Sequence, residues 1–323
     1  MTAVPGDAAL AARLDELVAG RPAVAATVAA GRTATASRGV PLEADVELGS
    51  VSKGLTGLLY ADAVDRGEVA PGTRLGDLLT DLDGSPAGDA VLAALATHRS
   101  GLPRLPAGSR ALRRTVALWR TGANPYGEDL PALLAQARRT RVGRPRPRYS
   151  NLGYELLGHA LAAAAGTTYA DLLHDRLTGP LGMGGTYVPA SPAQLRPGAA
   201  TGADRRGRPR APWTGEGLGP AGGVRSTAAD LGRLLAALLD GGAPGLRALD
   251  PVERLGPGAR IGAAWVVVRL PGRVLTWHNG GTGGFRSWVG LDRDAGCGAA
   301  VVAADGRGVD RQGQALLEGL GAA

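Results

Sequence analysis

Strand patterns lie near both ends of this 323-residue chain, and helical patterns fill the middle. Residues 23–30 and 32–37 predict a hairpin that turns at Gly31. Four more strands are predicted at hairpin spacing toward the C-terminus, over residues 264–268, 274–277, 287–291 and 299–303. Apolar periodicity predicts terminal helices over residues 7–19 and 310–320. Because strands at both ends need partners, the economical arrangement is one antiparallel sheet built from both termini.

The predicted fold class is therefore α+β: an antiparallel β-sheet flanked by terminal helices, with an all-helical inserted domain. Residues 1–66 and 224–323 are predicted to form the sheet domain, and residues 67–223 a mainly helical domain. A functional site is expected in the cleft between them. Between residues 105 and 129 the pattern predicts little beyond a helix around Trp119.

The first chemical motif is Ser50-Val51-Ser52-Lys53, at the start of a predicted helix. Residues three apart share a helix face, so the side chains of Ser50 and Lys53 are expected to point the same way. Lys53 is the only lysine in the chain, because all the other residues among the 36 Lys+Arg are arginines. Arginine stays protonated, whereas a desolvated lysine can take a proton from a serine hydroxyl. The alternative is a surface lysine on an amphipathic helix.

Two further motifs carry groups that suit the same chemistry. In the first, a phenol at Tyr149 near an ammonium group can shuttle protons, and Asn151 can orient a lysine or bind a substrate amide. The second motif is His278-Asn279-Gly280-Gly281, which follows a predicted strand. A glycine-rich strand edge lets a substrate lie against the backbone and exposes N–H groups to an oxyanion.

The order Ser-x-x-Lys, Tyr-x-Asn, His-x-Gly resembles the serine β-lactamase and penicillin-binding-protein superfamily. The surroundings are most similar to its branch of class C β-lactamases, DD-peptidases and esterase-like proteins. Two sequence segments between the motifs, residues 97–103 and 222–231, support the resemblance. It runs from about residue 46 to residue 305. It implies a β-lactamase/transpeptidase-like fold.

The resemblance also implies a role for each matching position. Ser50 would be the acylated nucleophile, and Lys53 and Tyr149 the coupled base, with the proton acceptor left open between them. Asn151 would touch both the substrate and Lys53. The backbone N–H groups of Ser50 and Gly281 would form the oxyanion hole.

His278, Asn279 and Gly280 form the third motif, and here the chain departs from the pattern. His278 stands where many β-lactamases have lysine, and Asn279 where a hydroxyl residue is common. A fixed positive charge for a substrate carboxylate is therefore missing, and His278 is expected to assist proton transfer or hold a substrate group.

The function predicted is a serine hydrolase that forms an acyl-enzyme on Ser50 with small ester, amide or lactam substrates. Three alternatives stay open: a β-lactamase or D-alanyl-D-alanine carboxypeptidase, a transacylase in secondary metabolism that passes the acyl group to a second nucleophile, and a ligand-binding sensor without turnover. A broken motif would be expected of the sensor, and all three motifs are intact.

Composition argues against other classes of protein. The net charge of +7 comes from scattered arginines, which disfavours a nucleic-acid partner. No His/Asp/Glu cluster has metal-ligand spacing, so neither a metal nor another cofactor is expected. No apolar run approaches 18 residues and no signal-peptide pattern opens the sequence, so we expect no membrane partner and a cytoplasmic location. His98, in a turn, is expected to bond the local backbone.

Overall fold

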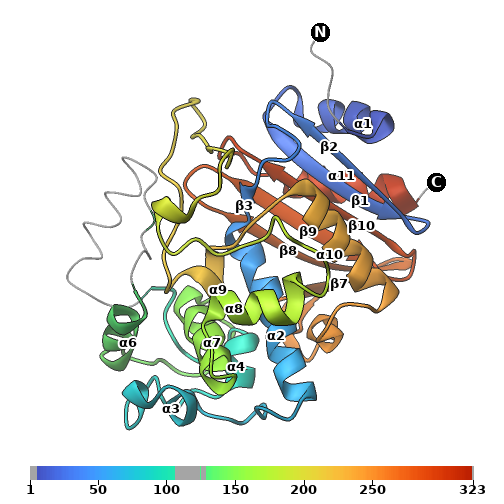
Figure 1. Cartoon of the computed structure of the whole chain (residues 1–323). Coiled ribbons are helices and arrows are strands. Elements are labelled where there is room, and N and C mark those ends of the chain that lie inside the picture. The colour runs from blue at the N-terminus through green and yellow to red at the C-terminus, as the bar shows by residue number, and fades with distance from the viewer. Residues whose placement is uncertain (1–5, 106–123, 125–128, 322–323) are drawn as a thin grey trace.

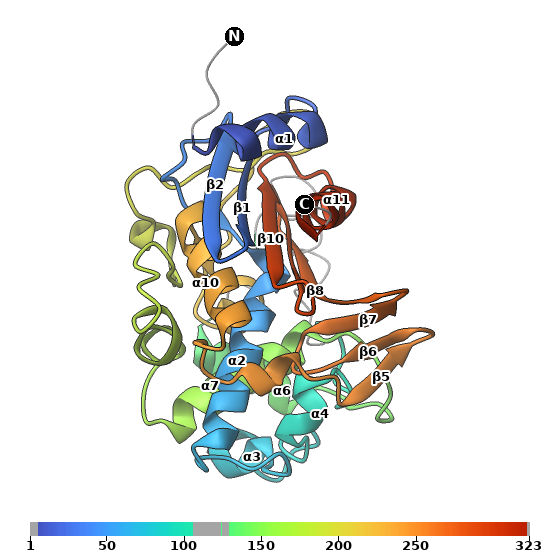
Figure 2. The ribbon, with the colours of Figure 1, turned by 90° about the vertical axis from the view of Figure 1, so that its right-hand side faces the viewer.

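A computed structural model describes residues 6–105, 124 and 129–321. The helix predicted around Trp119 falls outside the described residues. Eight strands form one antiparallel sheet in the order β2-β1-β10-β9-β8-β7-β6-β5 (Figures 1 and 2). Its strands are β1 (Ala23–Ala29), β2 (Arg32–Arg38), β5 (Glu253–Gly256), β6 (Ala259–Ile261), β7 (Val266–Leu270), β8 (Arg273–Gly281), β9 (Arg286–Asp292) and β10 (Cys297–Ala303). Because β1 pairs with β10, the sheet is built from both termini as predicted.

Both faces of the sheet are covered, which explains why β1 is apolar on both sides. Val24 and Ala26 belong to the larger apolar cluster, whereas Ala23 and Ala25 belong to a smaller one. Successive side chains of a strand point to opposite faces. Helices α1 (Ala8–Val18) and α11 (Asp310–Gly321) cover the face with the smaller cluster, and α10 (Ala228–Asp240) covers the other (Figure 2).

The middle of the chain supplies helices, including two that periodicity did not predict, over residues 130–138 and 219–222. They are α2 (Ser52–Asp65), α3 (Leu75–Leu78), α4 (Leu92–Ala96), α6 (Leu130–Arg138), α7 (Asn151–Ala164), α8 (Tyr169–Leu173) and α9 (Gly219–Gly222). Helix α2 is buried nearly all round, and it contacts α7 and α9 (Figure 1). The α+β fold with an antiparallel sheet is therefore confirmed.

One feature of the fold was not predicted from the sequence, and one prediction about the fold is not tested by the structure. Strands β5 and β6 were not predicted, because they are short and carry glycines and arginines instead of an apolar alternation. One continuous apolar cluster extends from the sheet into the helices, so the domain boundaries at 66/67 and 223/224 remain a prediction. Among the described helices, none combines the length and apolarity that a bilayer crossing requires.

A buried ion cluster fixes the strand that leads into Ser50. Strand β3 (Val46–Glu47) pairs with β4 (Arg225–Ser226). The guanidinium of Arg225 contacts the carboxylates of Asp45 and Glu47, the latter at 3.1 Å, and also donates to the carbonyl oxygen of Ala200 at 2.8 Å. Buried charges need such partners. The cluster therefore holds residues 45–47 in one place, just before the turn that carries Ser50.

Candidate active site

Ser50 lies in a 3₁₀ turn, η1 (Gly49–Val51), which leads directly into α2. The turn begins at Gly49, whose φ of +53° lies in the left-handed region that favours glycine. A Cβ atom at position 49 would lie 2.6 Å from the backbone nitrogen of Gly281. Position 49 therefore requires glycine for two reasons: its backbone conformation and the close approach of β8. The Ser50 side chain is half-buried.

The end of β8 packs against this turn. A Cβ atom at Gly280 would lie 2.8 Å from the Ser50 nitrogen, so the two segments touch. The pairing of β7 with β8 ends at Val266 and Trp277, whereas β8 runs on to Gly281. In the part of the chain that the structure describes, residues 278–281 therefore have no strand partner on the β7 side. This leaves an open strand edge beside Ser50.

The N–H of Gly281 faces that open edge. Thr282 donates its N–H to the Phe285 carbonyl oxygen across the β8–β9 turn, at 3.0 Å. In an antiparallel pair, neighbouring residues point their N–H groups alternately toward and away from the partner strand. The N–H of Gly281 therefore points away from β9, next to the Ser50 turn. With the N–H of Ser50, it makes the donor pair that an oxyanion hole needs.

Lys53 is fully buried one helical turn after Ser50. Its Nζ lies 3.3 Å from Ser50 Oγ and donates to the carbonyl oxygen of Ala221 at 2.5 Å. Within the described residues, Lys53 forms no ion pair with a carboxylate. Burial, reinforced by the charge of Arg104 and partly offset by Glu155, lowers the pKa of Lys53 to about 7. A substantial fraction of this amine is thus neutral at neutral pH.

Tyr149 approaches Ser50 from the start of α7. Its hydroxyl donates to Ser50 Oγ at 2.7 Å, and Lys53 Nζ lies 4.9 Å from the centre of its ring. The Tyr149 side chain remains 36% exposed, so the group is open to solvent on one side. Loss of water around the phenol raises the pKa of Tyr149 to about 12, although its hydrogen bond with Ser50 opposes the rise. At neutral pH Tyr149 is a proton donor.

His278 faces the same group, since the charge of Lys53 acts on its ring. His278 shares a strand face with Gly280, two residues on, and is buried with Nδ1 2.7 Å from the Asn279 carbonyl oxygen. Burial and the charge of Lys53 lower the pKa of His278 to about 4, so its imidazole is neutral at neutral pH. Asn151 is buried at the first residue of α7, two residues after Tyr149.

The side chain of Asn279, also predicted as part of the site, points away from Ser50. It donates to Asp310 Oδ1 at 2.5 Å and is exposed on the face of the sheet that carries α11. Strand alternation explains this placement, since adjacent residues of a strand point to opposite faces. The same alternation, applied to the sequence, would have separated Asn279 from His278 and Gly280.

Three groups near Ser50 were not predicted as parts of a site. The Ala221 carbonyl oxygen accepts from Lys53, the Arg104 guanidinium lies 5.7 Å from the Tyr149 ring centre, and the His98 ring lies 4.5 Å from the same ring. The His98 ring was expected to bond the local backbone of its turn, but its Nδ1 accepts from the N–H of Ser150, 52 residues further along the chain. Only the fold brings these groups together, and no spacing in the sequence relates them to Ser50.

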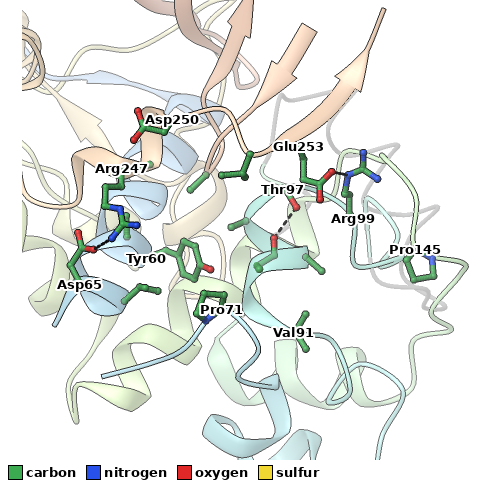
Figure 3. A pocket seen from close by; sticks show the side chains of 18 residues that line it. Tyr60, Asp65, Pro71, Val91, Thr97, Arg99, Pro145, Arg247, Asp250 and Glu253 are labelled. Carbon is green, nitrogen blue, oxygen red and sulfur yellow. Dashed lines mark hydrogen bonds and ion pairs between the residues drawn. The ribbon is translucent and has the colours of Figure 1, made fainter. Parts of the chain in front are cut away.

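A separate cavity of about 580 Å³ opens on the far half of α2. It is lined mainly by apolar residues such as Val64 and Val91, and the ion pairs Asp65–Arg247 and Arg99–Glu253 lie at its two ends (Figure 3). None of the predicted site residues lines it. The candidate site is therefore assigned from the convergence of reactive groups at Ser50. No group of His, Cys, Asp or Glu within the described ranges could hold a metal ion.

Comparison with known proteins agrees with the fold. The family model described as Beta-lactamase matches residues 5–323, and the chain belongs to this family. The D-alanyl-D-alanine-carboxypeptidase/endopeptidase AmpH of Escherichia coli K12 is 33% identical over 165 residues, which cover 48% of this chain and 40% of AmpH. Penicillin-binding protein 4 of Amycolatopsis lactamdurans is 30% identical over 261 residues, 76% of this chain and 62% of that protein. The chain thus spans less than two thirds of these relatives.

Solved structures show the same fold over the whole chain. A class C β-lactamase from Rhodobacter sphaeroides has a TM-score of 0.78 at 22% identity, covering 98% of this chain and 99% of its own. The D-alanine carboxypeptidase AmpC from Burkholderia cenocepacia has a TM-score of 0.80 at 24% identity, with the same coverage. The fold is therefore that of class C β-lactamases, as the resemblance implies.

Proposed function

We propose that this protein is a serine hydrolase that forms an acyl-enzyme on Ser50 with small ester, amide or lactam substrates. One observation carries the proposal: Ser50 Oγ is hydrogen bonded to both Lys53 Nζ, at 3.3 Å, and the Tyr149 hydroxyl, at 2.7 Å. These are the two groups able to accept or deliver its proton. Membership of the Beta-lactamase family supports the same chemistry.

The acylation step follows from the protonation states. Neutral Lys53 takes the proton of Ser50 as Oγ forms a bond to the substrate carbonyl carbon. The N–H groups of Ser50 and Gly281 stabilise the negative oxygen of the tetrahedral intermediate. When that intermediate collapses, the bond to the leaving group breaks and Tyr149 donates its proton to the departing atom. Transfer of the proton held on Lys53 to Tyr149 restores both groups, so the net transfer is from Ser50 to the leaving group.

Deacylation repeats these steps with water, or with a second nucleophile in a transacylase. The open edge of residues 278–281 suits an extended acyl group, which can add to it as a short strand. Neutral His278 offers no fixed charge to a substrate carboxylate, which favours uncharged esters and amides. The names of AmpH and penicillin-binding protein 4 support a second candidate, a carboxypeptidase or β-lactamase activity.

Intact-protein mass spectrometry tests the proposal. After incubation with p-nitrophenyl acetate or benzylpenicillin, the wild-type protein is expected to gain the mass of one acyl group. Ser50→Ala should show no gain and should lose at least ~10⁴-fold in ester hydrolysis. The matched control is Ser52→Ala, because Ser52 is buried on the same turn and its Oγ accepts from the Val224 N–H. Acylation that persists in Ser50→Ala, or is lost in a folded Ser52→Ala, would contradict the assignment.

A further inference from the structure

His98 lies behind Tyr149, two residues after the end of α4. It is buried, and its φ of +56° places a residue other than glycine in the left-handed region. Such a conformation is uncommon and persists only where the surroundings hold it. What His98 contacts is therefore informative about why the turn has this shape.

His98 holds the backbone on both sides of Tyr149. Its carbonyl oxygen accepts the N–H of Arg148 at 2.9 Å, and its Nδ1 accepts the N–H of Ser150 at 3.2 Å. The imidazole also packs against the Tyr149 ring, with 4.5 Å between centroids and a 41° tilt. One residue thus holds the N–H groups of the residues before and after Tyr149 and one face of the Tyr149 side chain.

The turn that carries His98 is itself anchored. The His98 N–H bonds the Leu95 carbonyl oxygen at 3.1 Å, and its ring lies 4.9 Å from that of Tyr154. The hydroxyl of Tyr154 donates to the Ala96 carbonyl oxygen at 2.5 Å, which also accepts from the N–H of Ala264. Helices α4 and α7 and the segment before β7 therefore converge on this turn, which makes it a rigid support.

His98 is uncharged, which suits a residue that packs beside a catalytic amine. Since Nδ1 accepts a hydrogen bond, a neutral ring carries its proton on Nε2. Burial, reinforced by the charge of Lys53, lowers the pKa of His98 well below its ordinary value. A neutral ring adds no second cation next to Lys53.

We infer that His98 is a positioning residue for the reaction: its ring, Nδ1 and carbonyl oxygen hold Tyr149 so that the phenol reaches Ser50 Oγ. This inference rests on the proposed function. A phenol displaced by about 1 Å can cost ~10²-fold in rate, because proton transfer needs the donor within hydrogen-bond distance.

Two variants separate the two kinds of contact. His98→Asn tolerates the left-handed backbone and offers an amide oxygen to the Ser150 N–H, but lacks the ring. His98→Phe keeps a ring but has no acceptor. The matched control is His159→Asn, because His159 is also buried, and it faces Tyr169 at 6.2 Å instead of Tyr149.

Single-turnover kinetics with p-nitrophenyl acetate give the first readout. Both His98 variants are expected to lower the acylation rate constant about 10- to 100-fold without changing substrate affinity, whereas His159→Asn keeps the wild-type rate. In a Tyr149→Phe background, His98→Asn should cause no further loss, because it acts through Tyr149. The inference is overturned if folded His98→Asn acylates at the wild-type rate, or loses the same factor with and without Tyr149.

Hydrogen exchange gives a readout that does not depend on turnover. In His98→Phe, or in His98→Ala if that variant fails to fold, the Ser150 amide should exchange faster, while His98→Asn retains part of its protection. Unchanged exchange across residues 148–150 would overturn the inference. If the wild-type protein forms no acyl-enzyme, the proposed function fails, whereas exchange still decides whether His98 holds this segment.

Discussion

Two buried cations lie on adjacent segments of this molecule and have opposite surroundings. Arg225 is 1% exposed and contacts the carboxylates of Asp45 and Glu47. Lys53 is 0% exposed, and the described residues place a serine hydroxyl and a carbonyl oxygen at its amine, with no ion pair. The N–H of Leu48 bonds the Val224 carbonyl oxygen at 3.0 Å, so the two regions are directly connected.

The difference separates a structural cation from a reactive one. An arginine held by two carboxylates keeps its charge and fixes the backbone around it. A lysine without such partners lowers the cost of its burial by releasing a proton, and its pKa falls to about 7. The same loss of water thus produces an ion cluster in one region and a candidate general base in the next.

Exchanging the kind of cation at position 53 should have the largest effect. Lys53→Arg keeps the positive charge but removes the group that can become neutral, so acylation should fall about 10³–10⁴-fold. Single-turnover ester hydrolysis by the folded variant measures the loss. Lys53→Met, which removes the charge together with the amine, is the comparison variant. An active Lys53→Arg enzyme would show that Lys53 is not the base.

Removing the structural cation should instead affect stability. Arg225→Met leaves the carboxylates of Asp45 and Glu47 buried without their partner, so the free energy of unfolding should fall by about 3–5 kcal/mol in urea denaturation. Arg247→Met is the matched control. Its ion pair with Asp65 leaves the two side chains 76% and 39% exposed, and exposed pairs contribute at most about 1 kcal/mol. If Arg225→Met and Arg247→Met lost the same free energy of unfolding, Arg225 would have no special structural role.

The pH dependence of acylation should show the state of Lys53 directly. Only the neutral amine accepts a proton, so the rate should rise about tenfold per pH unit below pH 7 and level off above it. Single-turnover rates between pH 3 and 11 measure this limb. A limb near the ordinary pKa of lysine, about 10.4, would mean that burial leaves Lys53 charged. A limb near pH 4 would assign the titration to His278 instead.

The sequence predicted the parts of the fold and of the site that depend on local spacing. The strands at both ends appear in one sheet, and the three-residue spacing of Ser50 and Lys53 does place their side chains together. The motif grouped Asn279 with His278, although strand alternation in the same sequence separates the two side chains, and no spacing could find His98. The direction of the Asn279 side chain follows from strand alternation. His98 reaches Tyr149 only through the packing of α4 against α7.

By itself, the sequence determined the chemical inventory of this protein: one lysine three residues after a serine, a tyrosine far along the chain, and a glycine-rich strand end. Only the tertiary structure decided which of these groups meet and in which protonation state. The physical reason is that helix and strand periodicity act over a few residues. Desolvation and hydrogen bonding at Lys53, by contrast, depend on segments such as Ala221, 168 residues away in the chain.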